Sequence, residues 1–136
     1  MRFAVFDTNV IIAAAISRTG IPSQLIHDWV LQDEVRLVVC PFVVREYREV
    51  VRRPKFLRYD FPPDWLESLI EDSLHVRDPQ TWPMSIPHRE DGIFLALAHA
   101  TKAWLVTGNL RHFPASVRRG VTVLSPADYL AQLTSR

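Results

Sequence analysis

The stretch RFAVFDTNVIIAAAIS, residues 2–17, decides what fold to expect from this chain. Residues 2–6 form a mostly apolar run, as in a strand that is buried on both faces. The polar residues Asp7, Thr8 and Asn9 follow, and the last two can cap a helix formed by the apolar residues after them. We therefore expect a strand, an acidic residue and a helix as the first structural unit.

The rest of the chain continues this alternation of buried strands and amphipathic helices. From the spacing of apolar residues we expect strands over residues 35–40, 103–107 and 121–124, and helices over residues 23–32, 41–53, 63–74, 90–101 and 127–133. Buried strands separated by helices indicate a mostly parallel sheet that is covered on both faces. Ligands of such sheets bind at the carboxyl ends of the strands.

Length and composition favour a single compact domain over residues 1–136, since 48% of the residues are hydrophobic. The net charge is +1, and the basic residues are arginines except for Lys55 and Lys102. The one cysteine, Cys40, follows an apolar run, so we expect a buried thiol and no internal disulfide. The longest apolar run, residues 10–16, is too short to cross a bilayer, which favours a cytoplasmic protein with no membrane partner.

Four polar side chains lie at the ends or on the inward faces of elements that are otherwise apolar. Asp7 and Asn109 follow predicted strands, Asp91 opens an apolar helix, and Glu46 lies beside the apolar face of the helix over residues 41–53. Buried carboxylates that meet in one cleft repel each other unless a cation holds them. Oxygen ligands without histidine or cysteine favour Mg²⁺ or Mn²⁺ over zinc, and such ions support phosphodiester hydrolysis.

Each acid also has a simpler interpretation. Asp7 and Asp91 could be helix caps, which is a common use of aspartate. Glu46 could be a boundary residue that pairs with Arg45 or Arg48. The three together favour a metal site more strongly than any one of them does alone.

Four short motifs occur in an order that resembles a known family. They are FDTN at residues 6–9, EYREVVRRPKF at 46–56, Asp91 with FLALA at 94–98, and LVTGN at 105–109. Together they resemble a PIN-domain protein, similar to the VapC-like toxin ribonucleases of bacterial and archaeal toxin-antitoxin pairs.

The resemblance implies a three-layer α/β/α sandwich with a mostly parallel sheet of four or five strands. It also implies a Mg²⁺- or Mn²⁺-dependent ribonuclease in which Asp7, Glu46 and Asp91 are the core metal-binding acids. Thr8, Asn9 and Thr107 match polar positions that would hydrogen-bond around the site. Family members are often homodimers, and toxins of this type are neutralised by a small antitoxin, so both partners are expected here.

Asn109 departs from the family pattern, because many relatives carry a fourth acid at this position. An asparagine can still offer a carbonyl oxygen to a metal, so we keep Asn109 among the candidate catalytic residues, with one negative charge fewer. The alternative is a PIN-like module that binds RNA or protein with weak or no nuclease activity. The three retained acids favour cleavage over that alternative.

Four basic or titratable residues are candidate contacts for the RNA backbone. They are Arg48 and Arg52 on the helix that carries Glu46, and Arg111 and His112 after a predicted strand. A solvated helix face is the alternative for the arginines, and a loop contact is the alternative for His112. Phosphoacceptor and dehalogenase-type folds also place an aspartate after the first strand, but the further acids that they require are absent from this sequence.

Overall fold

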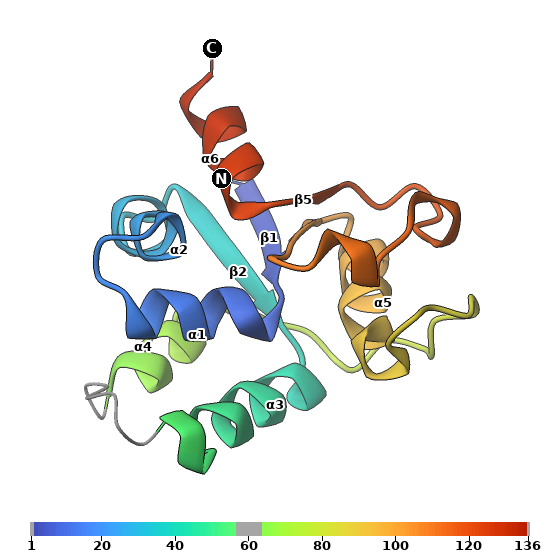
Figure 1. The fold of residues 1–136 in the computed structure, drawn as a ribbon, viewed down its shortest axis with the longest axis horizontal. Helices are drawn as coiled ribbons and strands as arrows, with labels where there is room; N and C mark the ends of the chain where they lie inside the picture. Colours follow the sequence, from blue (N-terminus) through green and yellow to red (C-terminus); the bar gives the residue numbers. More distant parts are fainter. Residues whose placement is uncertain (1, 57–63, 136) are drawn as a thin grey trace.

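The computed structural model describes residues 2–56 and 64–135 (Figure 1). Within these residues five strands form one parallel sheet: β1 (Arg2–Phe6), β2 (Val35–Val39), β3 (Leu74–His75), β4 (Trp104–Val106) and β5 (Val123–Leu124). The strand order is β3-β2-β1-β4-β5, so the first strand of the chain is the central one. The expected α/β fold with a mostly parallel sheet is confirmed.

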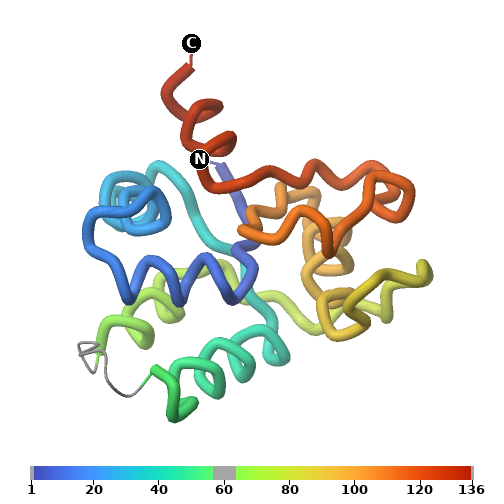
Figure 2. The backbone as a smooth tube through the Cα atoms, viewed as in Figure 1, coloured from blue at the N-terminus to red at the C-terminus, as the bar shows by residue number. Residues whose placement is uncertain are grey.

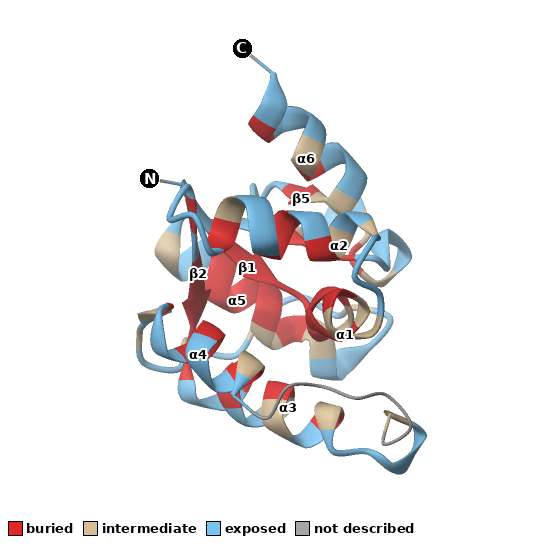
Figure 3. Cartoon of the chain, turned by 90° about the vertical axis from the view of Figure 1, so that its left-hand side faces the viewer, coloured by how far each residue is buried: buried red, intermediate tan, exposed pale blue. Residues whose placement is uncertain are grey.

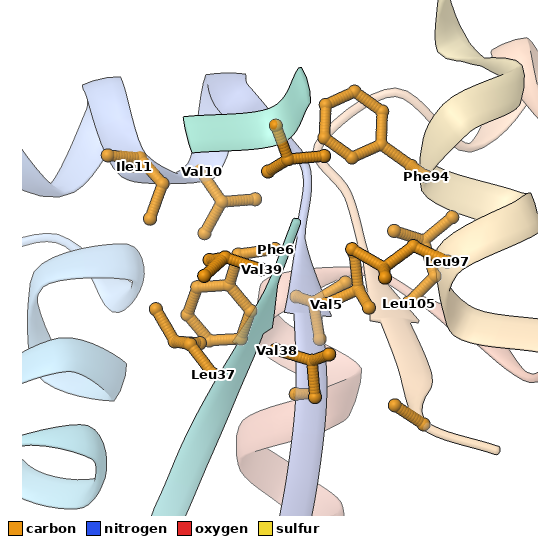
Figure 4. Close-up of a cluster of buried hydrophobic side chains, with 14 of the residues drawn as sticks. Val5, Phe6, Val10, Ile11, Leu37, Val38, Val39, Phe94, Leu97 and Leu105 are labelled. Carbon is orange, nitrogen blue, oxygen red and sulfur yellow. The ribbon is translucent and has the colours of Figure 1, made fainter. Parts of the chain in front are cut away.

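Six α-helices of the described chain surround this sheet: α1 (Thr8–Ile16), α2 (Ile21–Gln24), α3 (Pro41–Val51), α4 (Trp65–Glu71), α5 (Gly92–Thr101) and α6 (Pro126–Thr134). α5 packs against β1, β2 and β4, while α1 lies on the opposite side of the sheet (Figures 1 and 4). The result is the layered α/β/α arrangement. No helix of the described residues combines the length and apolarity needed to span a bilayer.

Alternation along the strands divides the core between the two faces of the sheet. Phe6 and Val39 point toward α1, whereas Val5 and Val38 point toward α5 (Figure 4). All four side chains are fully buried, and the strands and the inner faces of the helices form one continuous core (Figure 3). Cys40 belongs to this core, as expected.

Register places the first candidate residue at the carboxyl edge of the sheet. Phe6 of β1 lies opposite Val106 of β4, and the Asp7 amide donates a hydrogen bond of 2.9 Å to the Val106 carbonyl. Asp7 and the residues that follow β4 therefore emerge side by side, because parallel strands end at the same edge.

The helix predicted over residues 23–32 has a different geometry. α2 is followed directly by a π-helical turn, Leu25–Val30, in which the Leu31 amide donates to the Ile26 carbonyl at 2.8 Å. A π turn changes the hydrogen-bond spacing from four to five residues without removing the apolar spacing that suggested a helix. The prediction of a helix here was right in position and wrong in type.

The helix predicted over residues 63–74 is shorter than expected. α4 ends at Glu71, and Leu74 and His75 form the edge strand β3 beside Val38 and Val39. Two residues are too few to show the alternation that identifies a strand. Residue 63, where we expected the helix to begin, lies outside the described residues.

Candidate active site

Asp7 is fixed by hydrogen bonds from two different segments. It stands at the N-cap position of α1, but its carboxylate makes no capping bond. Instead Oδ2 accepts a bond of 2.7 Å from the Thr107 hydroxyl and one of 3.2 Å from Asn9 Nδ2. The side chain is 4% exposed. The simple role of a helix cap therefore does not account for Asp7.

The segment after β4 closes around this carboxylate. The Gly108 amide donates to Asn9 Oδ1 at 3.1 Å, and the Asn109 amide donates to the Thr107 hydroxyl at 3.0 Å. A Cβ atom at position 108 would lie 3.3 Å from Asn9 Oδ1, so glycine permits this close approach. Asn109 itself is exposed at the edge of the site.

Glu46 reaches the same region from α3. Its carboxylate accepts a hydrogen bond from the Thr8 hydroxyl, which follows Asp7 in the chain. The neighbouring Tyr47 is buried, and its hydroxyl donates to the carbonyl of Phe6, the last residue of β1. These two bonds attach α3 to the start of α1 and to the end of the central strand, and Glu46 is half-buried.

Asp91 lies at the junction between a short 3₁₀ turn, Arg89–Asp91, and α5. It makes no side-chain cap to α5. Its Oδ2 atom lies 2.8 Å from Nδ1 of His112, and the His112 ring stacks on His88 with 3.7 Å between ring centroids. Asp91 is half-buried and is oriented by an imidazole.

The three acids lie close enough to influence one another electrostatically. Burial raises the pKa of Asp7 to about 6, and the charges of Asp91 and Glu46 raise it as well, while the Thr107 hydrogen bond acts in the opposite direction. Burial and the charge of Asp91 raise the pKa of Glu46. Burial also raises the pKa of Asp91, against the lowering effect of the hydrogen bond from His112. A cation in this region would relieve the repulsion.

The donor set fits a hard divalent ion that keeps part of its water shell. In the described ranges no three His, Cys, Asp or Glu side chains are grouped closely enough to hold a metal ion by themselves. Zinc sites need three or four protein ligands, whereas Mg²⁺ commonly takes one or two carboxylates together with waters and substrate phosphates. One or two of the carboxylates of Asp7, Glu46 and Asp91 could therefore hold an ion of the second kind together with waters.

The predicted RNA-contacting residues lie in different surroundings. Arg48 forms a two-pronged ion pair with Glu67 of α4, at 2.9 and 2.6 Å, so its guanidinium connects two helices. Arg52 and Arg111 are exposed. His112 contacts Asp91 directly. The structure thus brings His112 to the acids and engages Arg48 elsewhere.

Two residues of the site were not predicted. Tyr47 lies on the buried face of α3 and looks like an ordinary core aromatic in the sequence. His88 lies in the irregular segment before Asp91, and only the folded chain brings it onto His112. The short distance between His88 and Asp91 in the sequence was the one available signal.

A comparison with protein-family models finds the PIN domain over residues 4–111, which is most of the chain. The chain therefore belongs to the PIN-domain family. A search of curated proteins finds no match. PIN domains are typically metal-dependent nucleases, and PIN nucleases act on RNA.

Proposed function

We propose that this protein is a Mg²⁺- or Mn²⁺-dependent ribonuclease that hydrolyses phosphodiester bonds of single-stranded or structured RNA. The observation that carries the proposal is the electrostatic influence that Asp7, Glu46 and Asp91 have on one another, since the charge of Asp91 raises the pKa of both Asp7 and Glu46. Such an arrangement costs stability unless it binds a cation. Membership of the PIN-domain family supports the same activity.

The residues around the acids have defined tasks in this proposal. Asp7, Glu46 and Asp91 would hold the ion, which when bound polarises a phosphodiester and makes water a better nucleophile. Thr107 and Asn9 fix the Asp7 carboxylate, and Thr8 fixes that of Glu46. The Nδ1–H group of His112 would donate a hydrogen bond to Asp91 and so orient that carboxylate. Asn109 offers a neutral oxygen where a fourth acid would add charge.

We extend the proposal to the biological setting. Residues 1–136 would form a single PIN domain that acts as the cytoplasmic toxin of a toxin-antitoxin pair, as a homodimer neutralised by a small antitoxin. The resemblance of the four sequence motifs to VapC-like toxins supports this assignment. Sedimentation equilibrium tests the homodimer, which has twice the 15.7 kDa mass of one chain. Growth arrest on expression of the wild type, relieved by Asp7→Asn, tests the toxin role.

The test of the activity is cleavage of a mixed single-stranded RNA pool by purified protein in Mg²⁺ or Mn²⁺. We expect cutting that EDTA abolishes and that Asp7→Asn reduces by at least a hundredfold, roughly the loss when one positioned electrostatic group is removed from an active site. Asp28→Asn is the matched control, because Asp28 is an exposed aspartate of the π-helical turn and should leave cleavage unchanged.

The binding-module alternative predicts a different result. A folded wild type that retains RNA and never cuts it, with either metal, would refute the ribonuclease and favour a module that only binds. Asn109→Asp would then test whether the missing fourth acid explains the lack of cutting. Cleavage by this variant would show that it does.

A further inference from the structure

A pocket of about 850 Å³ is formed by residues of α3 and α5 and by the connection that leads into α5. It is bounded by the start of α3, by the irregular connection between β3 and α5, and by the first turn of α5. That connection can be followed alongside α5 in Figure 2. The volume falls within the range of roughly 300–1,000 Å³ that is typical of small-molecule sites.

The walls of this pocket are held by contacts to three different segments. Asp78 Oδ1 accepts a hydrogen bond of 2.9 Å from the Phe42 amide, which ties the connection to the first turn of α3. Trp82 donates from Nε1 to the Val117 carbonyl at 3.0 Å. Gly92 of α5 faces the connection, since a Cβ atom there would come into contact with the Trp82 Cβ atom at 3.4 Å. The pocket is therefore built into the fold.

Phe42 gives the pocket an open aromatic wall. Its side chain is 40% exposed although it is large and apolar, and the Arg45 guanidinium lies over one face of the ring, 5.3 Å from its centroid. The ring and this guanidinium together offer a stacking surface, because any nucleobase can stack on an aromatic ring or on an arginine side chain.

The same elements carry the candidate catalytic acids. Phe42 and Glu46 lie four residues apart on α3, and residues with this spacing share one face of a helix. Across the pocket, Glu90 and Gly92 are wall residues and flank Asp91 in the chain. A strand of RNA with a phosphate at the acids therefore has the pocket within reach of its next base.

The pocket has no excess of positive charge that would favour a phosphate as its occupant. Asp78 and Glu90 contribute two carboxylates, while Arg89 lines the pocket and the Arg45 guanidinium lies over the Phe42 ring. Carboxylates repel phosphate and accept hydrogen bonds from the amino groups of bases.

We propose that this pocket binds one unpaired base of an RNA strand whose neighbouring phosphate lies at Asp7, Glu46 and Asp91, with Phe42 as the stacking surface. The inference rests on the proposed ribonuclease function and specifies its substrate as RNA that is single-stranded next to the cleaved bond. A paired base cannot enter the pocket without leaving its helix, and unpairing costs free energy.

Binding of a short fluorescein-labelled single-stranded RNA, followed by anisotropy, tests this proposal. All proteins carry Asp7→Asn so that the RNA stays intact. We expect Phe42→Ala to weaken binding by about tenfold or more, as removal of a base-stacking aromatic typically does. Phe3→Ala is the matched control, because Phe3 is also 40% exposed but lies at the amino end of β1, and it should leave binding unchanged.

A series of RNAs that each lack one base gives a second readout. Loss of one particular base should weaken binding to the Asp7→Asn protein as much as Phe42→Ala does, and should cause no further loss in the Phe42→Ala protein. Equal thermal melting of the two aromatic variants shows that both are folded.

The outcomes separate this inference from the ribonuclease proposal. If the wild type cuts RNA in a metal-dependent way and Phe42→Ala binds as tightly as its parent, the pocket assignment is wrong and the ribonuclease stands. If every missing base weakens binding by the same factor with and without Phe42→Ala, no base depends on Phe42. The pocket assignment is then also wrong. If the protein neither cuts nor binds RNA, both proposals fail.

Discussion

Asp7 combines burial with the nearby charges of two other acids, and this has a consequence for stability. Its pKa is about 6 in the folded protein and 3.8 in an unconstrained chain. Between these values the folded state holds a proton that the unfolded state releases, so rising pH lowers the free energy of unfolding. We expect metal-free protein to lose up to about 3 kcal/mol from this group as the pH rises through that interval. Urea unfolding in EDTA measures the loss.

Comparison of variants isolates the contribution of Asp7. Asp7→Asn should remove this part of the pH dependence and should be more stable than the wild type above pH 6, whereas Asp28→Asn should follow the wild type. Mg²⁺ should then stabilise the wild type more than Asp7→Asn, since a ligand that binds only the folded state raises its stability. If the free energy of unfolding depends on pH in the same way for Asp7→Asn and for the wild type, the raised pKa of Asp7 is contradicted.

The two fully buried tyrosines provide a second prediction for single residues. Tyr47 donates its hydroxyl to the Phe6 carbonyl, whereas the Tyr129 hydroxyl has no hydrogen-bond partner among the described residues. Tyr47→Phe should lower the free energy of unfolding by about 1–3 kcal/mol, because it leaves a buried carbonyl unpaired. Tyr129→Phe should cost little or increase stability. Chemical unfolding measures the free energy of unfolding of both variants. Equal losses in the two variants would contradict the difference in hydrogen bonding.

Among single residues, the sequence identified the acids as candidates but did not reveal all of their contacts, and the role of the acids stays a prediction. Asp7 and Asp91 stand out because each is a charge beside an apolar run, which a sequence shows directly. The stack of His88 on His112 depends on how two irregular segments pack, and no local pattern encodes that packing. The side chains of Thr8, Asn9 and Thr107 donate hydrogen bonds to the acids. Their contribution to metal binding stays a prediction.

Among the elements, α5 is followed by a residue in a conformation that only glycine adopts readily. Lys102 caps α5 with φ 58° and ψ 26°, in the left-handed region. This region costs a residue with a Cβ atom about 1–2 kcal/mol, and glycine is the usual residue there. We expect Lys102→Gly to raise the free energy of unfolding by up to about 1 kcal/mol, since the greater freedom of unfolded glycine offsets part of the gain. Thermal melting measures the effect.

Lys102→Ala is the control for this prediction. Alanine removes the charge and the long side chain but keeps the Cβ atom, so it should give no such gain. Equal stabilisation by alanine and glycine would attribute the effect to the lysine side chain and not to the backbone.

Element boundaries were predictable to the extent that apolar spacing was unambiguous. α3 and α5 occur close to where they were expected, because the buried residues of α3 recur at helical spacing and α5 is a long apolar segment that is buried from Phe94 to Ala98. β3 was missed because Leu74 and His75 become a strand only through pairing with β2. The π-helical turn was missed because its distinguishing hydrogen bonds leave no trace in composition.

The whole molecule encloses one thiol that can report its global opening. Cys40 is fully buried, and burial raises the pKa of its thiol to about 11, so little reactive thiolate forms near neutral pH. We expect a disulfide reagent to label native protein only as fast as the fold opens, and denatured protein at once. Lys102→Gly should slow the labelling by the same factor by which its added stability lowers the population of the open form. Rapid labelling of native protein would contradict the burial of Cys40.

The bond between Thr107 and Asp7 joins residues that are 100 positions apart in the chain. During translation Asp7 leaves the ribosome early, whereas Thr107 follows only after β2, α3 and α5 have emerged. A nascent chain therefore lacks the residue that positions its Asp7 carboxylate until β4 and the segment after it have been made. If the proposed nuclease activity depends on this bond, a chain that still lacks Thr107 cannot cleave the messenger RNA from which it is being made.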